Sequence, residues 1–218
     1  MRVYHFVKLD FGLEDVRRRR LKIATLNDVN DPFELLGFSS ADANVRKRFQ
    51  LLKEKLTMSR GMLCFSRHWR NPVLWSHYAD GHRGMCLGFD LPDEFLVPVQ
   101  YQAKRLEPNL AALEGDESSA ADEMREVLST KYSHWRYENE LRCFVSLDEQ
   151  DKQNGFYFLR FSQQLALREV IVGHSSTLSR PVLTDALGEL AGEVSVCKAR
   201  LAFRSFKVVR QRNRKLWE

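Results

Sequence analysis

The residues best suited to chemistry lie in the segment Trp135-Arg-Tyr-Glu-Asn-Glu-Leu-Arg142. Two carboxylates, Glu138 and Glu140, are followed at the same spacing by the guanidinium of Arg142. If the segment is an extended strand, these three side chains share one face. Paired carboxylates raise one another's pKa and a neighbouring arginine lowers it again, so the group could supply an acid or a base. The alternative for the same pattern is a surface strand that carries a charge pair.

A histidine near the start of the chain is a second candidate. The alternation of side chains from Val3 to Val7 predicts a strand, with His5 on the face opposite Tyr4 and Phe6. Two interpretations stay open for His5: a ligand-binding residue, or a half-buried strand histidine with no further role.

The polar run Asn27-Asp-Val-Asn-Asp-Pro-Phe-Glu34 is a third candidate. Asn and Asp side chains bond to their own backbone in turns, and Pro32 keeps Asp31 out of the helical region. Polar loops between strands often carry function, so Asn30, Asp31 and Glu34 could contact a ligand. An Asx turn that caps a helix beginning at Pro32 explains the same residues without one.

The stretch from Met62 to Asp90 must position these groups, and its pattern predicts a strand, a polar loop, a short helix, a turn and a second strand. Asn71 suits the cap of the short helix and Pro72 suits its first turn. Trp75 and Tyr78 then share one helical face. Gly84 and Gly88 indicate a turn and a close approach of two backbones.

The other elements follow from periodicity and breakers. Helices are expected over 12–20, 41–58 and 178–191, with a helix-rich region over 106–131, and strands over 21–26, 95–101, 134–146, 156–161, 169–172, 194–197 and 201–209. Because strands and helices do not alternate regularly, the fold class is predicted as α+β, with a curved or split mixed sheet of about eight strands flanked by helices. Residues 1–209 are expected to form a single domain, and 210–218 a loosely held basic tail.

Length and composition limit the function classes. A chain of 218 residues can bury about 70% of the surface that its unfolded form exposes. No apolar run approaches a membrane span, and the N-terminus lacks the apolar segment of a signal peptide, so we expect a cytoplasmic protein with no membrane contact. The four cysteines are far apart without a Cys-x-x-Cys pair, which argues against a zinc site and a disulfide framework. Cys64 would be a poor nucleophile because an apolar strand raises its pKa.

The formal net charge of +5 is concentrated in clusters at 17–22, 46–55 and 207–215. Such clusters are either solvated faces or a surface for a polyanion such as nucleic acid or a dinucleotide phosphate.

Six motifs, taken in order, resemble a bacterial family called domain of unknown function 2971. The resemblance covers residues 1 to about 175. The motifs are Tyr4-His5, Asn30-Asp-Pro-Phe-Glu34, Cys64-Phe-Ser66, Asn71-Pro-x-x-Trp-Ser-His-Tyr-Ala-Asp80, Gly84-x-Cys-x-Gly-Phe-Asp90 and Trp135-x-Tyr-Glu-x-Glu-x-Arg142.

The same order of parts also resembles ADP-ribosyltransferases of the His-Tyr-Glu kind, which use NAD as a substrate. This resemblance implies an ADP-ribosyltransferase-like fold in which His5 binds the adenosine ribose, Tyr78 stacks on nicotinamide, and Glu140 is the catalytic glutamate. The candidate site residues are catalytic Glu140 and Glu138 and cofactor-binding His5, Tyr78, Ser66, Arg142, Asn30 and Asp31, with no metal. The expected function is an NAD-consuming enzyme that modifies nucleic acid or protein in bacterial defence or toxin systems.

Two other functions stay open. A metal-dependent nuclease or nucleotide hydrolase would hold a divalent ion with Asp31, Glu34, Glu138 and Glu140 and would use His77 as base. A non-catalytic nucleic-acid-binding module would use the arginine clusters with Trp69 and Trp75 as exposed aromatics.

Overall fold

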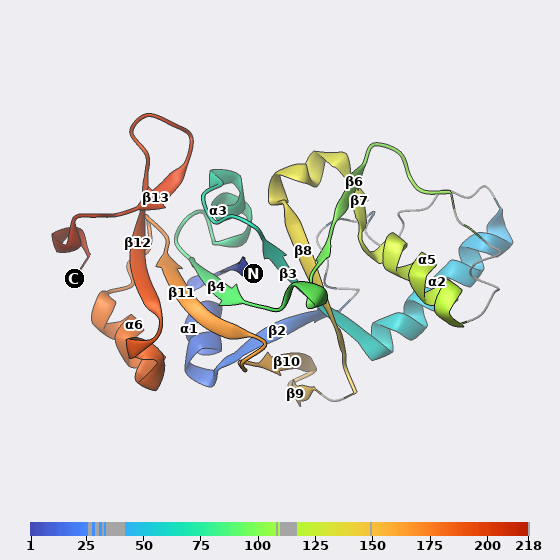
Figure 1. Cartoon of the computed structure of the whole chain (residues 1–218), viewed down its shortest axis with the longest axis horizontal. Coiled ribbons are helices and arrows are strands. Elements are labelled where there is room, and N and C mark those ends of the chain that lie inside the picture. Colours follow the sequence, from blue (N-terminus) through green and yellow to red (C-terminus); the bar gives the residue numbers. More distant parts are fainter. Residues whose placement is uncertain are drawn as a thin grey trace.

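A computed structural model describes residues 1–25, 28, 31, 33, 42–107, 109, 117–148 and 150–217 (Figure 1). The helices are α1 Leu9–Arg18, α2 Ala43–Ser59, α3 Pro72–Tyr78, α5 Glu117–Leu128 and α6 Arg180–Leu187. The strands are β1 Arg2–Val7, β2 Arg20–Thr25, β3 Arg60–Ser66, β4 Met85–Asp90, β5 Val97–Pro98, β6 Gln100–Gln102, β7 Thr130–Tyr132, β8 Glu140–Ser146, β9 Asp151–Gln153, β10 Phe156–Arg160, β11 Ala166–Val172, β12 Ser195–Leu201 and β13 Val208–Arg210. Short 3₁₀ helices span η1 Asp93–Phe95, η2 Ser133–Glu138, η3 Gly188–Gly192 and η4 Arg214–Leu216.

Over the described ranges, eleven strands join in one mixed sheet with the order β13-β12-β11-β4-β1-β3-β2-β10-β9, while β8 pairs with β3 and β5. The pair β11–β12 is parallel, whereas β1, β4 and β11 run antiparallel to their neighbours in the middle of the sheet. Strands β6 and β7 form a separate parallel pair. This arrangement confirms the predicted mixed α+β class with one large sheet and helices.

Strand β3 is the point where the sheet divides. It pairs with β8 along its whole length, from Arg60 opposite Ser146 to Ser66 opposite Glu140. Its other edge is shared, because β2 pairs at Gly61 and β1 pairs at Ser66. Strand β3 therefore lies between β1 and β8, which matters for the candidate residues that these two strands carry.

The two faces of the sheet pack against different helices. The largest core cluster lies on the face of β1 that carries Val3 and Val7, and it contains Val16 of α1 and Leu183 of α6. A second cluster, around Trp75 of α3, lies on the opposite face, and Figure 1 shows α3 and α1 on different sides of β4. A third cluster joins β3 to α2 and α5. Strand alternation thus separates two environments across one layer.

The segment from β3 to β4 folds as its sequence predicts. The Asn71 side chain accepts a hydrogen bond from the backbone N–H of Val73 at 2.9 Å, with Pro72 in the first turn of α3. Gly84 sits where a Cβ would lie 2.2 Å from the carbonyl oxygen of Val7, so only glycine fits this close approach of backbones. Trp75 is fully buried beneath the turn.

Several predictions about elements were wrong, among them the strand expected over 201–209, because β12 ends at Leu201 and β13 begins only at Val208. The strand expected over 134–146 begins only at Glu140, because 133–138 forms the 3₁₀ helix η2 and Asn139 follows with a positive φ of 46°. The C-terminal segment is not a loose tail throughout. Trp217 is buried, and its indole N–H donates a hydrogen bond to the carbonyl of Leu178 at 2.8 Å. Burial of a large aromatic ring with a satisfied N–H fixes this end to the core.

Among the helices of the described residues, none has both the length and the apolar character that crossing a membrane requires.

Candidate functional site

Two glutamates meet at a buried lysine. Glu138 ends η2 and Glu140 begins β8, and the left-handed backbone of Asn139 between them turns both side chains inward. Lys131 of β7 donates a hydrogen bond from Nζ to Glu138 Oε2 at 2.7 Å and to Glu140 Oε2 at 3.3 Å. Each of the three side chains is less than a tenth exposed. A charge-assisted contact at these distances in a dry site is strong.

Arg142 completes the pairing of Glu140 from the same strand. Its Nε and Nη2 donate to the two carboxylate oxygens of Glu140 at 3.0 and 3.3 Å, and its Nη1 donates to the carbonyl of Leu128 in α5. Arg142 has no exposed surface, and burial lowers its pKa to about 10 although the charge of Asp31 acts in the opposite direction. The predicted convergence of the two carboxylates with this guanidinium is therefore present.

Tyr78 brings α3 to the same place. Its hydroxyl donates a hydrogen bond to Glu138 Oε1, so the aromatic ring lies beside the acid pair. Burial raises the pKa of Tyr78 well above its usual range, and the hydrogen bond and charge of Glu138 raise it further. The hydroxyl therefore stays protonated and acts as a donor. We refer to Tyr78, Lys131, Glu138, Glu140 and Arg142 as the carboxylate cluster.

The protonation of Glu140 is the electrostatic feature of the cluster that bears on chemistry. Burial raises the pKa of Glu140 to about 7, the negative charge of Glu138 adds to this effect, and the positive charge of Lys131 opposes it. A carboxyl group with a pKa near neutrality can both accept and release a proton under physiological conditions.

The backbone around the cluster is fixed by two hydroxyl groups. Ser66 Oγ donates to the carbonyl oxygens of Glu138 at 2.6 Å and of His68 at 3.1 Å. The hydroxyl oxygen of Tyr101 in β6 accepts from the backbone N–H of Glu140 at 2.8 Å. Ser66, predicted as a cofactor ligand, is thus close to the cluster but its hydroxyl is directed at the backbone.

His5 does not join the cluster, and the predicted pocket shared by His5, Tyr78 and Glu140 is wrong. Its face of β1 also carries Val3 and Val7 and belongs to the main core, whereas Glu140 lies on the opposite face of the sheet. His5 Nδ1 lies 3.0 Å from the carbonyl oxygen of Cys64, and its ring packs edge-on against Phe65. Burial lowers its pKa, so the ring is a neutral donor to that carbonyl. The prediction that His5 lies on the face opposite Tyr4 and Phe6 was correct. Because of this orientation, the His5 side chain does not reach the carboxylate cluster.

Among the described residues of the polar run 27–34, Asp31 lies near the carboxylate cluster. Asp31 is buried, its Oδ1 accepts from the backbone N–H of Phe33 at 2.9 Å, and its Oδ2 has no hydrogen-bond partner among the described residues. Its charge acts on Arg142, so it lies near that end of the cluster. The predicted residues Asn30 and Glu34 lie outside the described residues.

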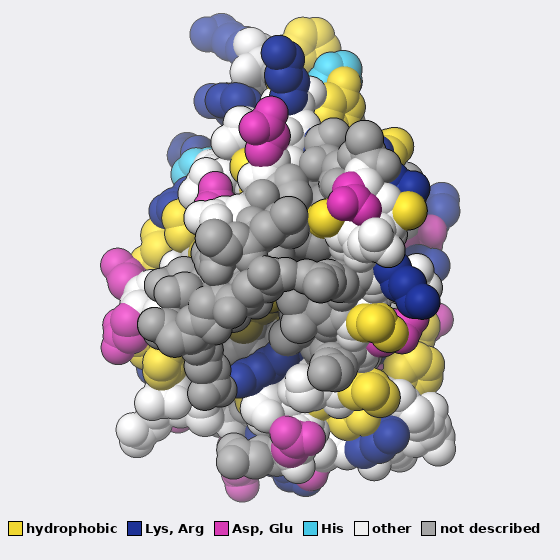
Figure 2. Space-filling view, turned by 90° about the vertical axis from the view of Figure 1, so that its right-hand side faces the viewer, with side chains coloured by type: hydrophobic (Ala, Val, Ile, Leu, Met, Phe, Trp, Pro, Cys, Tyr) yellow, Lys and Arg dark blue, Asp and Glu magenta, His cyan; other side chains and the backbone are white. Residues whose placement is uncertain are grey.

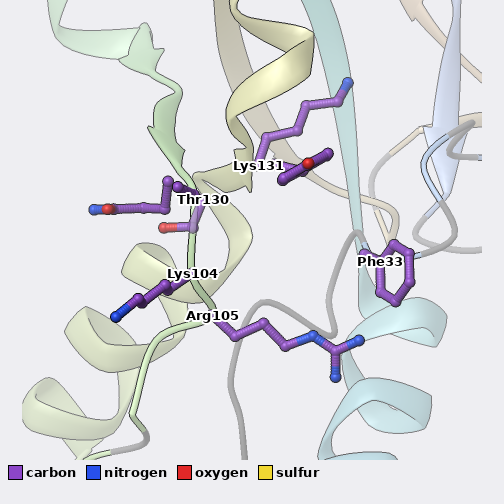
Figure 3. Close-up of a pocket in the computed structure, with 8 residues that line it drawn as sticks. Phe33, Lys104, Arg105, Thr130 and Lys131 are labelled. Atoms are coloured by element: carbon purple, nitrogen blue, oxygen red, sulfur yellow. The ribbon is translucent and has the colours of Figure 1, made fainter.

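A pocket of about 360 Å³ adjoins the cluster on the side of β6 and β7 (Figure 3). Phe33, Lys104, Arg105 and Lys131 are among its lining residues. The guanidinium of Arg105 lies 4.7 Å from the centre of the Phe33 ring, and Figure 3 shows the Lys131 amine extending away from Phe33. Lys131 therefore belongs both to the pocket wall and to the carboxylate cluster.

Three side chains named in the alternative functions do not take the positions those functions need. His77 is exposed on α3, and its ring packs against the rings of Tyr137 and Tyr78, with 6.0 Å between ring centres in each case. The lysine amine occupies the space between the two glutamates where a divalent ion would bridge them. Trp69 and Trp75 were predicted as exposed aromatics, which is wrong, because both are buried and the Trp75 indole donates to the carbonyl of Trp69 at 2.6 Å.

Across the part of the chain that the structure describes, there is no group of three or more His, Cys, Asp or Glu side chains arranged to hold a metal ion. Burial raises the pKa of the Cys64 thiol well above its usual range, and the neighbouring charge of Glu140 adds to this, as predicted for a poor nucleophile.

The sequence analysis missed Lys131 and Tyr101. Lys131 fell at the end of a region predicted as helix-rich, where a lysine is normally exposed. A signal was nevertheless present, since Lys131 stands next to Thr130 and Tyr132, two residues that favour strands. A lysine inside such a run needs a buried partner, and the nearest acids in sequence are Glu138 and Glu140.

Residues 74–143 match the model of a family described as protein of unknown function (DUF2971), which supports the resemblance to that family over a shorter range than expected. The matched range contains every member of the carboxylate cluster. No curated protein and no solved structure matches the chain. No solved structure therefore supports the expected ADP-ribosyltransferase-like fold.

Proposed function

We propose that the chain is an NAD-consuming, ADP-ribosyltransferase-like enzyme whose reaction centre is the carboxylate cluster. The observation that carries the proposal is the double role of Lys131. This residue ties two buried carboxylates, one with a pKa near 7, to a pocket that offers an aromatic ring and two cations. Titratable groups with perturbed pKa values beside a concave pocket are typical of catalytic sites.

The pocket has the side chains that a dinucleotide needs. Phe33 is about half exposed at 51% and can present its face to a planar ring. Lys104 and Arg105 can pair with a pyrophosphate, and Arg105 can do so with two parallel hydrogen bonds. A volume of about 360 Å³ accommodates part of NAD and leaves the remainder outside.

The chemistry assigns different tasks to the two glutamates. Cleavage of the bond between nicotinamide and ribose leaves neutral nicotinamide and an oxocarbenium-like sugar, which a carboxylate stabilises. Glu138 is held in place by Tyr78 and Lys131 and suits this electrostatic task. The acceptor then bonds to the anomeric carbon and gives up its proton, which Glu140 can take because its pKa is near 7.

This proposal differs from the His-Tyr-Glu pattern in two respects. His5 has no role in it, because the sheet separates His5 from Glu140. Tyr78 positions Glu138 by a hydrogen bond and is not assigned to stacking on nicotinamide. Phe33 takes the aromatic role in the pocket.

The experiment that tests the proposal measures nicotinamide release from NAD, with water as the acceptor, by chromatography. We expect turnover by the wild type and a loss of at least about 100-fold for Glu140→Gln, in the range that general acid–base groups contribute. Arg105→Ala should raise KM more than it lowers kcat, because it removes a contact that is present in the ground state too. The control is Arg17→Ala, an exposed cation on α1 far from the pocket in the sequence.

Two results would contradict the proposal. One is wild-type protein that neither releases nicotinamide nor melts at a higher temperature in the presence of NAD. The other is turnover that Glu138→Gln and Glu140→Gln leave unchanged, because the carboxylate cluster would then have no part in the reaction.

A further inference from the structure

The loop between β12 and β13 exposes two phenylalanine rings almost completely. Phe203 is 91% exposed and Phe206 is 98% exposed. The backbone N–H of Ala202 bonds to the carbonyl of Lys207 at 2.9 Å, so the loop closes on itself and its rings project from the surface. The guanidinium of Arg200 lies 4.7 Å from the centre of the Phe203 ring. Two fully solvated aromatic rings on one closed loop are unusual without a binding role.

A basic cavity lies at the base of this loop. Its volume is about 600 Å³, and Phe206 and Lys207 line it together with Arg67 and Arg70 of the segment after β3. None of its nine lining residues, all of them described, is Asp or Glu. The loop rises at the left-hand end of Figure 1, away from the side that faces the viewer in Figure 2. The cavity therefore joins positive charge to an exposed aromatic ring.

The floor of the cavity is held firmly. The backbone N–H of Val208 bonds to the carbonyl of Arg70 at 2.9 Å, which ties the hairpin to the segment after β3. Trp69, buried below, accepts the hydrogen bond from the Trp75 indole. A surface built on such fixed elements loses little conformational entropy when a ligand binds.

Two residues that line the cavity also bond to the backbone on either side of Glu138. The Asn71 side-chain amide donates to the carbonyl of Tyr137 at 2.9 Å, and the backbone N–H of Arg67 donates to the carbonyl of Asn139 at 3.2 Å. Tyr137 and Asn139 flank Glu138 in sequence. The segment that lines the basic cavity is thus bonded directly to the segment that carries Glu138.

We propose that this surface, formed by the 202–207 loop and the Arg67–Asn71 segment, binds single-stranded nucleic acid. Exposed rings stack with unpaired bases, whereas a duplex hides the faces of its bases inside the helix. The cations of the cavity pair with successive phosphates. A chain is a better match than a flat anionic membrane, since Arg67, Arg70 and Lys207 line a hollow that a flat surface would not enter.

Binding to this surface does not depend on the NAD reaction. The bound strand would also be the acceptor for ADP-ribose, and this role rests on the proposed function. Nicotinamide release to water, with no nucleic acid present, tests the reaction centre alone, so the failure of either proposal can be told from the failure of the other.

The test is fluorescence anisotropy with fluorescein-labelled oligothymidylate and oligouridylate, each about 15 nucleotides long, which is the length that such stacking grooves cover. We expect Phe203→Ala and Phe206→Ala each to weaken binding about tenfold, as removal of a stacking ring does. Arg70→Ala should reduce the slope of log affinity against log salt by about 0.7, the value for one phosphate contact with a single strand.

The matched controls are Phe11→Ala and Arg17→Ala, an exposed ring and an exposed cation on α1, and both should bind like the wild type. Far-ultraviolet circular dichroism melting of each variant confirms that it is folded. The proposal is overturned if the wild type binds neither oligonucleotide or if a duplex of the same length binds equally well. Vesicles of phosphatidylcholine and phosphatidylserine that bind in place of the oligonucleotides would also overturn it, and so would phenylalanine variants that bind as tightly as the controls.

Discussion

Substitution of Lys131 by methionine removes the charge that separates the two buried glutamates and keeps most of the apolar stem. The Lys131 amine lies 2.7 Å from Glu138 and 3.3 Å from Glu140, and its side chain is 3% exposed. Burial acts against the ammonium form, but the charges of Glu140 and Glu138 prevail and raise the pKa of Lys131 above its usual value, so the wild-type residue is charged at every pH of interest.

The expected loss of stability is large and depends on pH. Removal of one partner from a buried ion pair costs about 3–5 kcal/mol, because the other charge is left without compensation. Lys131 lowers the pKa of Glu140, so Lys131→Met raises that pKa further above 7. The pKa of Glu140 in the folded variant then lies above its value in the unfolded chain. The loss of stability is therefore complete above the folded pKa and is relieved below it, where the native state binds the proton. Each unit of additional shift adds about 1.4 kcal/mol to the loss at high pH.

The assay is urea unfolding of the wild type and Lys131→Met at about pH 8.5 and about pH 5.5, on either side of the Glu140 pKa. The matched control is Lys152→Met, an exposed lysine of β9, for which we expect a change within about 0.5 kcal/mol. Adding Glu140→Gln to Lys131→Met should recover part of the loss at high pH, since it removes the unpaired charge. A loss below about 1 kcal/mol, or an equal loss at the two pH values, would refute the electrostatic account of the cluster.

Three further predictions concern positions outside the cluster. His5→Leu should lower stability by about 1–3 kcal/mol, because the Cys64 carbonyl loses its donor, yet leave kcat/KM for NAD within about threefold; a collapse of turnover in folded protein would place His5 in the site after all. Asp15→Asn should stabilise the protein by about 4 kcal/mol near pH 8 and by almost nothing near pH 4, as thermal or urea unfolding would show. The reason is that burial raises the pKa of Asp15 to about 7, so its ionised form opposes folding only at higher pH. Gly84→Ala should cost at least about 2 kcal/mol in the same assay, whereas Gly192→Ala, with open space around its Cβ, should be neutral or slightly stabilising; equal effects would contradict the close packing assigned to Gly84.

Local chemistry made the central stretch predictable from sequence. The cap at Asn71, the proline after it and the glycine at position 84 each act within a few residues, so no knowledge of the fold was needed to place α3 and β4. The convergence of Glu138, Glu140 and Arg142 was also predicted. It arises differently, because Glu138 reaches the site from η2 and the left-handed Asn139, and is not part of β8.

The position of His5 shows where sequence reasoning reached its limit. Alternation gave the correct face relative to Tyr4 and Phe6. Strand alternation could not show on which face of the sheet α3 and the two glutamates would pack. That choice depends on how β8 pairs with β3. The resemblance to His-Tyr-Glu transferases supplied an answer that the sheet does not allow.

Exposure of aromatic residues was the other point that sequence could not decide. Trp69 and Trp75 stand among polar residues, which suggested a surface, but one tryptophan donates to the backbone of the other and both are buried. Phe203 and Phe206 fell within a stretch predicted as a strand, which suggested alternation into a core. The chain instead turns at 202–207, and both rings lie in solvent.

The central claim is that NAD reacts at the carboxylate cluster with part of the molecule held in the adjoining pocket. The most direct measurement is a crystal structure of the Glu140→Gln protein soaked with NAD. Our account predicts ligand density in the pocket lined by Phe33, Lys104 and Arg105, with the nicotinamide riboside bond directed at Glu138. Density confined to another surface, or a pocket that stays empty at saturating NAD, would contradict it.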